Sequence, residues 1–111
     1  MTPEGKTKNA IKNWLIAHGI IPAAQVNEYL VRKTPFDGWY YMPTQGMYSV
    51  KGVPDFIICY RGRFIAIEAK APQGSTTPNQ DDQIEAIVQA GGRAFVVAGV
   101  GDLSEMLLEA A

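Results

Sequence analysis

The chain has 111 residues, of which 47% are hydrophobic, so we expect one compact domain that spans residues 1–111. Its single cysteine, Cys59, excludes an intramolecular disulfide and favours a reducing compartment. The sequence shows no leader peptide, and no apolar run approaches the ~18 residues of a membrane span. We therefore expect a soluble, cytoplasmic protein with no membrane partner.

The net charge of −1 conceals an uneven distribution of charged residues. Residues 1–70 hold nine Lys and Arg against five Asp and Glu, whereas residues 71–111 hold Arg93 against six acids. A basic half can follow a phosphate backbone, but the same side chains can also be ordinary solvated groups that do not cluster in space. The candidate nucleic-acid contacts in this half are Lys6, Lys8, Lys51 and Arg61.

The first part of the chain is predicted to contain two helices and an aromatic strand. Thr2, followed by proline, is typical of the N-cap of a helix that ends near Gly19. A second helix is predicted over residues 22–33. A turn over 34–38 then leads into a strand over 39–42, which is rich in aromatic residues.

The central segments, 55–60 and 63–70, are predicted to pair as a hairpin with Arg61-Gly62 as its two-residue turn. Both faces of this hairpin are apolar, which favours a position inside a sheet that helices cover on both sides. One predicted face consists of Ile57, Cys59, Phe64 and Ala66, and the other consists of Phe56, Ile58, Ile65 and Ile67.

The last third of the chain carries two helix-start signals. Thr77-Pro78-Asn79-Gln80 is a capping box for a helix that ends near Ala90. A buried strand is expected over 94–98, and a second capping box over 102–105 predicts a last short helix. The element order predicts an α/β fold in which helices flank a central mixed β-sheet.

The predicted hairpin places ionisable residues together at one end. With Arg61-Gly62 as the turn, Asp55 lies directly opposite Glu68, and directly opposed residues share a face of the sheet. Lys70 lies two residues beyond Glu68 and shares that face. We therefore predict a catalytic site built from these three side chains.

Two opposed carboxylates repel one another unless a cation compensates them. Their hard oxygens suit Mg²⁺ or Mn²⁺, with Asp55, Glu68 and the Ala69 carbonyl as predicted ligands, and no organic cofactor is expected. Such an ion would activate water and stabilise the charge that develops during phosphodiester hydrolysis. A structural ion pair with Lys70 at a strand end is the alternative, but burying two acids and a lysine only for structure is costly.

Two further residues are candidates for the same site. Glu4 lies in the first turn of the first helix, on the stripe shared with Ile11 and Leu15, so it can overhang the sheet edge. Its alternative role is to complement the helix dipole. Gln80 can hold the attacking water or a phosphate oxygen, or it can serve only as the partner of Thr77 in the capping box.

The motifs resemble the VRR-NUC family of virus-type replication-repair nucleases, within the PD-(D/E)xK superfamily. The resemblance rests on four ordered segments that span nearly the whole chain: residues 1–6, residues 52–56, residues 67–70 and residues 77–80. It implies a restriction-endonuclease-like core and Mg²⁺- or Mn²⁺-dependent DNA cleavage. By position, Asp55 and Glu68 resemble the metal ligands, Lys70 the catalytic lysine, Glu4 the first-helix acid and Gln80 the glutamine of the last motif.

The resemblance also implies a homodimer that acts on branched DNA such as four-way junctions, since small members, often encoded by phages, look like such enzymes. The stretch 22–37 is long for a minimal member, and residues 20–48 hold more large apolar groups than a small domain readily buries. This segment either forms an interface or is an outer layer of the core. Two other functions stay open: a DNA junction-binding module that does not cleave, and a nuclease subunit that needs a helicase partner.

Overall fold

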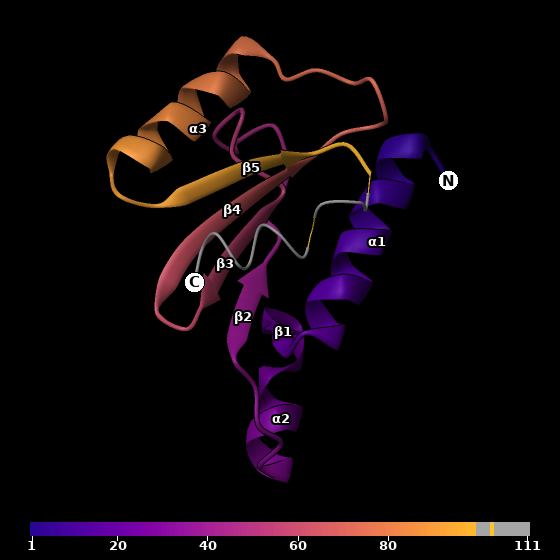
Figure 1. The fold of residues 1–111 in the computed structure, drawn as a ribbon, viewed down its shortest axis with the longest axis vertical. Coiled ribbons are helices and arrows are strands. Elements are labelled where there is room, and N and C mark those ends of the chain that lie inside the picture. The colour runs from indigo at the N-terminus through magenta and orange to yellow at the C-terminus, as the bar shows by residue number, and fades with distance from the viewer. Residues whose placement is uncertain (100–102, 104–111) are drawn as a thin grey trace.

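The computed structural model describes residues 1–99 and residue 103 (Figure 1). The predicted last helix over 102–105 lies outside this part of the chain, apart from Leu103, which is buried. No helix in the described part is long and apolar enough to cross a membrane. The elements in chain order are α1 (Pro3–Ala17), β1 (Ile20–Pro22), a short 3₁₀ turn (Ala23–Gln25), α2 (Val26–Arg32), β2 (Gly38–Tyr41), β3 (Phe56–Tyr60), β4 (Arg63–Ala69), α3 (Pro78–Gln89) and β5 (Arg93–Val97).

The five strands form one mixed sheet in the order β1-β2-β3-β4-β5. The β2–β3 and β3–β4 pairs are antiparallel, whereas β1–β2 and β4–β5 are parallel. Phe56 pairs with Ile67, as predicted, and the turn is Arg61-Gly62, with φ angles of 49° and 81°. Positive φ at both turn residues matches the twist of a two-residue hairpin. The mixed sheet and the hairpin register are therefore confirmed.

Helix α1 covers one face of this sheet. Thr2 caps it by accepting a hydrogen bond from the Gly5 amide at 3.0 Å, and Ile11 and Leu15 are completely buried. These side chains follow the 3.6-residue period expected for a helix that packs by one stripe. They join a core cluster with the alternating strand residues Tyr40, Phe56, Ile58, Ile65 and Ile67.

The other face of the hairpin is only partly covered, so the prediction of complete burial on both sides is wrong. Cys59 is exposed and Phe64 is 44% exposed. Helix α3 contacts β5. A Cβ atom on Gly92 would clash with both Ile87 of α3 and Phe64, so the helix comes close to Phe64 at this point. With 12 residues, α3 extends about 18 Å, which is too short and too near the sheet edge to cover β2 and β3.

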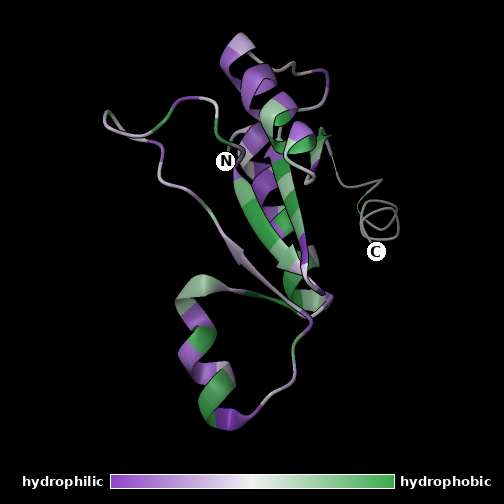
Figure 2. Ribbon diagram, turned by 90° about the vertical axis from the view of Figure 1, so that its left-hand side faces the viewer, coloured by the Kyte–Doolittle hydropathy of each residue, from purple (hydrophilic) through white to green (hydrophobic). Residues whose placement is uncertain are grey.

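The predicted helix over 22–33 is wrong at its start, because Pro22 ends a strand. Ile20 and Ile21 are at most 1% exposed, and β1 pairs with β2 through Ile20 and Gly38. A Cβ atom on Gly38 would lie 2.9 Å from Ile20 Cγ1, so glycine permits this close pairing. The remaining helix, α2, has 7 residues and buries none of them. Figure 2 shows it projecting from the sheet.

Candidate active site

Four elements and one loop meet at the end of the hairpin opposite its turn. They are the first turns of α1, the start of β3, the end of β4, the first turn of α3, and the β2–β3 loop, residues 42–55. Together they enclose a cavity of about 170 Å³. The residues that line it are Glu4, Lys8, Gln45, Gly52, Val53, Asp55, Glu68 and Gln80. The structure thus brings together Glu4, Asp55, Glu68 and Gln80, which the sequence had singled out.

Asp55 precedes β3 and is only 6% exposed. Its Oδ2 accepts a hydrogen bond from the Ala69 amide at 2.9 Å, which fixes the carboxylate across the strand pair beside Glu68. Its Oδ1 lies 3.5 Å from Lys8 Nζ. The contact between Ala69 and Asp55 is made by the Ala69 amide. The Ala69 carbonyl stays a predicted metal ligand.

Glu68 is the most deeply placed acid of the cavity, with 3% of its surface exposed. Its Oε1 accepts a hydrogen bond from Gln80 Nε2 at 3.0 Å and lies 3.9 Å from Lys70 Nζ. Its Oε2 is buried and has no hydrogen-bond partner among the described residues. A buried carboxylate oxygen without a partner is costly for the fold, so Oε2 is the atom in this site that most needs a ligand.

Burial raises the pKa of Glu68 to about 8, from an ordinary value of 4.5. Charge repulsion by the neighbouring Asp55 carboxylate is part of this rise in pKa, to which Glu4 adds a smaller part, whereas Lys70 acts to lower the pKa. The paired carboxyls therefore hold a proton near neutral pH when no cation is bound. A cation that displaces this proton would restore the charged pair.

Gln80 has its predicted place in the capping box, and it also contacts Glu68, which was not predicted. Its Oε1 accepts a hydrogen bond from the Thr77 amide at 3.0 Å, and its own amide donates to Thr77 Oγ1 at 3.3 Å, which completes the capping box. Its Nε2 remains free to donate to Glu68. Because the cap holds Gln80 Oε1, the direction of the Nε2 group is fixed toward the cavity.

The β2–β3 loop is held against this helix start by Gly52. A Cβ atom on Gly52 would lie 2.4 Å from the carbonyl carbon and oxygen of Asn79, and its φ angle is +87°. Only glycine combines this conformation with so close an approach. Gly52 therefore allows the loop to pack closely against the start of α3, where it forms one wall of the cavity.

Lys8, a candidate nucleic-acid contact, lies at the cavity itself. Its ammonium is in the cavity wall, 3.7 Å from Glu4 Oε2 and 3.5 Å from Asp55 Oδ1. The signal was present in the sequence, since Glu4 and Lys8 are four residues apart on one helix face. Lys8 thus helps to neutralise the acids that surround the site.

The other candidate nucleic-acid contacts are dispersed. Lys6 lines a separate cavity with Pro72, and Lys51 is exposed on the β2–β3 loop next to Gly52. Arg61 lies at the far end of the hairpin, about 20 Å from Asp55 along six strand residues. There it pairs with Asp37 at 3.8 Å and covers the Tyr60 ring. The structure does not bring Arg61 to the cavity.

The donor set of the cavity fits an ion that takes few protein ligands. No group of three His, Cys, Asp or Glu side chains in the described chain is arranged to hold a metal. Asp55 and Glu68 supply two carboxylates, one of them with an orphaned oxygen. Mg²⁺ is commonly held by one or two carboxylates and completed by water and substrate phosphates, so these residues fit Mg²⁺ better than a metal that needs a closed protein site.

Comparison with solved structures gives a clear likeness. No family model and no curated protein matches the sequence. A solved structure described as a VRR_NUC domain protein matches with a TM-score of 0.57 and 21% sequence identity. The alignment covers 96% of this chain and 86% of the other. This likeness agrees with the motif resemblance and with the mixed sheet flanked by helices: the chain has the fold of a VRR_NUC domain.

Proposed function

We propose that this chain is a nuclease that hydrolyses phosphodiester bonds in DNA with the help of Mg²⁺ or Mn²⁺. The observation that carries the proposal is the buried pair of Asp55 and Glu68 beside Lys70, with Glu68 Oε2 left without a partner. As a purely structural cluster this arrangement destabilises the fold. A phosphate-bearing substrate and a cation would make use of all of these groups.

Asp55 and Glu68 would hold the ion, and the bound ion would supply charge stabilisation for the phosphate and a more acidic water. Asp55 is already aligned by the Ala69 amide, so little reorganisation accompanies binding. Glu4, which faces the same cavity through its pair with Lys8, would accept hydrogen bonds from waters around the ion.

Lys70 and Gln80 would act on the reacting groups. Lys70 is 8% exposed and its ammonium lies 3.9 Å from Glu68 Oε1, where it would orient the attacking water and balance the negative charge of the phosphate. The Gln80 amide, fixed by the cap, would hold Glu68 in place. Lys51, exposed beside the cavity, would contact the DNA backbone.

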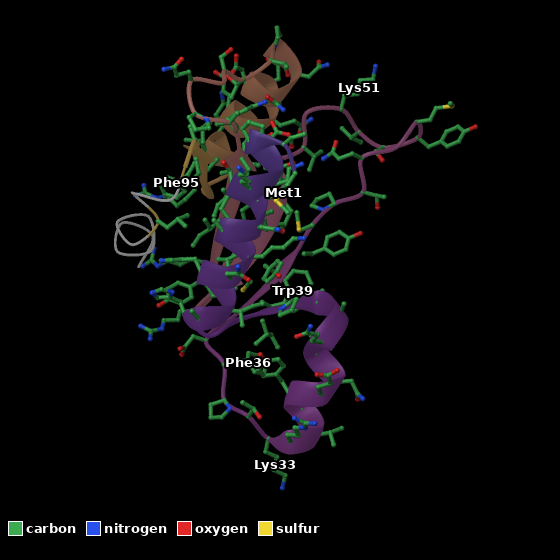
Figure 3. The ribbon with its side chains drawn as sticks, turned by 90° about the vertical axis from the view of Figure 1, so that its right-hand side faces the viewer. Met1, Lys33, Phe36, Trp39, Lys51 and Phe95 are labelled. Atoms are coloured by element: carbon green, nitrogen blue, oxygen red, sulfur yellow. The ribbon has the colours of Figure 1, made fainter. Side chains whose placement is uncertain are left out.

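We further propose that the substrate is branched DNA and that the enzyme acts as a homodimer. The proposal is supported by α2, whose residues Leu30 and Val31 are 59% and 70% exposed. An isolated helix of 7 residues is not stable by itself in water, so a partner surface would account for it. Phe36 and Trp39, labelled in Figure 3, lie on the same side of the molecule. A two-fold dimer would present two cavities to one junction. We place the protein in the cytoplasm, where the free, exposed Cys59 stays reduced.

The test is cleavage of a labelled four-way junction, a flap, a single strand and a plain duplex with Mg²⁺, with Mn²⁺ and with EDTA. Wild-type protein is expected to make paired nicks in the junction, and only when the metal is present. Lys70→Ala is expected to lower this cleavage about 100-fold, because one positioned group is lost. A chain that binds the junction but never cuts it would be a binding module. Cleavage that survives in Lys70→Ala and Asp55→Asn would show that the site lies elsewhere.

The oligomeric state is tested separately by light scattering on the eluting protein. Leu30→Glu together with Val31→Glu is expected to convert a dimer into a monomer, and the matched change Val88→Glu on exposed α3 is not. A wild-type chain that elutes as a monomer at all concentrations would contradict the dimer.

A further inference from the structure

The tip of the β2–β3 loop is a turn, residues 46–49, in which large apolar side chains are exposed to solvent. Tyr48 is 98% exposed and Met47 is 89% exposed, the highest values among the exposed large hydrophobic side chains of the described chain. Figure 2 shows the loop reaching outward from the sheet, away from the covered core. Full exposure of two neighbouring large side chains forgoes the stabilisation that burial gives, so this turn is poorly explained by folding alone.

The turn is ordered by its own hydrogen bonds. The Ser49 amide donates to the Gly46 carbonyl at 3.1 Å, and the Gly46 amide donates to Ser49 Oγ at 2.9 Å. Met47 and Tyr48 therefore occupy the two central positions of a closed four-residue turn. The turn holds both side chains outward before any ligand arrives, which lowers the entropy lost on binding.

The base of this loop is the wall of the candidate active site. Gln45, Gly52 and Val53 line the cavity of Asp55 and Glu68. Tyr48 lies three residues from Gln45, so it is within about 10 Å of the cavity wall at ~3.4 Å per residue. That distance corresponds to at most about three nucleotides along one DNA strand, at ~3.4 Å each.

A cation accompanies the aromatic side chain. Lys51 is exposed on the same loop, and Figure 3 shows its amine directed away from the body of the protein. An exposed aromatic ring and a lysine on one loop suit single-stranded nucleic acid, because the ring can stack on a base while the ammonium contacts a phosphate. The loop also lines the cavity that we propose binds phosphate, which favours a nucleic acid over a protein partner.

We propose that Tyr48, assisted by Met47, stacks on an unpaired nucleobase within about three nucleotides of the phosphate that would bind at Asp55 and Glu68. The inference rests on the proposed nuclease function and deepens it by naming a determinant of substrate choice. In continuous duplex the bases are already stacked on one another, and exposing one costs energy. At a branch, gap or flap an unpaired base is available, so the turn favours such substrates over duplex.

The experiment compares wild-type protein with Tyr48→Ala and Tyr48→Phe, with Val88→Ala as a control for loss of an exposed apolar side chain far from the cavity. Each protein is mixed in EDTA with a duplex and with the same duplex carrying a three-nucleotide gap. The fluorescent base 2-aminopurine is placed in turn at each gap position, and binding is followed by its quenching and by anisotropy of a distant label. Cleavage of the same DNAs with Mn²⁺ is measured in parallel.

Wild-type protein is expected to quench 2-aminopurine at one gap position and to prefer gapped DNA. Tyr48→Ala is expected to lose that quenching and to bind gapped DNA about tenfold more weakly, which is within the range of one base–aromatic stack. Its binding to duplex should be unchanged. Tyr48→Phe keeps the ring and should behave like wild type, as should Val88→Ala.

Several results would overturn the proposal. If Tyr48→Ala keeps both the quenching and the preference for gapped DNA, the stacking proposal is overturned and the nuclease function is left intact. Tyr48→Ala that changes the oligomeric state instead would assign the turn to contact with a second copy of the chain. A wild-type protein that neither binds nor cuts any of these DNAs would overturn the nuclease function itself, and this inference with it.

Discussion

The two ends of the β3–β4 hairpin differ in how deeply their charged residues are buried. At one end, Asp55 and Glu68 are 6% and 3% exposed and face each other. At the other end, Arg61 pairs with Asp37 through side chains that are 62% and 52% exposed. An exposed pair adds little to stability, whereas burial of two neighbouring carboxylates with a lysine is costly for the fold. The contrast supports the proposal that the buried end serves the function of the protein.

The largest expected effect comes from removing the charge at the buried end. Glu68→Gln should lower metal-dependent DNA cleavage by about a thousandfold or more, because several kcal/mol of transition-state stabilisation by the ion are lost. The fold should survive, since Gln keeps the size of Glu68. Cleavage is measured under single-turnover conditions, and circular dichroism checks the fold. If Glu68→Gln unfolds, Asp55→Asn is used in its place. Full activity in Glu68→Gln and in Asp55→Asn would refute the assignment.

The second effect is on the pH dependence of stability without metal. Glu68 has a pKa of about 8 in the fold and 4.5 as its ordinary value, so between these pH values the folded state holds a proton that the unfolded state has released. Because the folded state binds more protons, the free energy of unfolding falls as pH rises through this window. Thermal melts in EDTA should show the melting temperature falling from pH 5 to pH 8.

The matched control for this pH effect is Glu68→Gln, which cannot titrate. Its melting temperature should vary less between pH 5 and pH 8 than that of wild type. Equal slopes for the two proteins would mean that another group dominates the titration.

A smaller effect separates the two roles of Gln80. Gln80→Glu keeps the capping box, because Glu serves as well as Gln at this position, but it places a third carboxylate against Glu68. Cleavage should fall about tenfold while the helix start remains capped. Gln80→Ala also removes the half of the capping box that the Gln80 side chain provides, and it should lower the free energy of unfolding by about 1 kcal/mol. Equal stability losses in the two variants would indicate that the contact with Glu68, not the cap, is structural.

The smallest effect is expected at the exposed end. Arg61 has a φ angle of 49°, a conformation that asparagine tolerates better in a two-residue hairpin turn. Arg61→Asn should therefore leave the free energy of unfolding within about 0.5 kcal/mol and change DNA cleavage by less than about twofold. A larger loss of DNA affinity with unchanged stability would assign the hairpin turn to the nucleic-acid surface.

Much of the site could be predicted because it depends on the register of one hairpin. Once Arg61-Gly62 is recognised as a turn, side-chain alternation fixes Asp55 opposite Glu68 and puts Lys70 on the same face. The place of Gln80 in the capping box was also predicted, but its contact with Glu68 was not, because the sequence alone does not show how the start of α3 lies against β4.

The remaining features depend on contacts between distant segments. Residues 20–22 form a strand only because Gly38 allows β2 to approach closely, and helix periodicity near Pro22 does not reveal this. The open face at Cys59 depends on where α3 crosses the sheet. The place of Lys8 depends on the angle at which α1 meets β3. The sequence included Tyr48 only among the many large apolar residues of 20–48, because the exposure of one loop residue follows from the course of the whole loop.

The central claim, that Asp55 and Glu68 form a metal site, is tested most directly by the effect of Mn²⁺ on thermal stability at pH 8 without DNA. Wild-type protein should gain about 5 °C in melting temperature at a tenfold excess of Mn²⁺ over its dissociation constant. Asp55→Asn should gain almost nothing. A wild-type melting temperature that does not respond to Mn²⁺ or Mg²⁺, or an equal gain in Asp55→Asn, would contradict the claim.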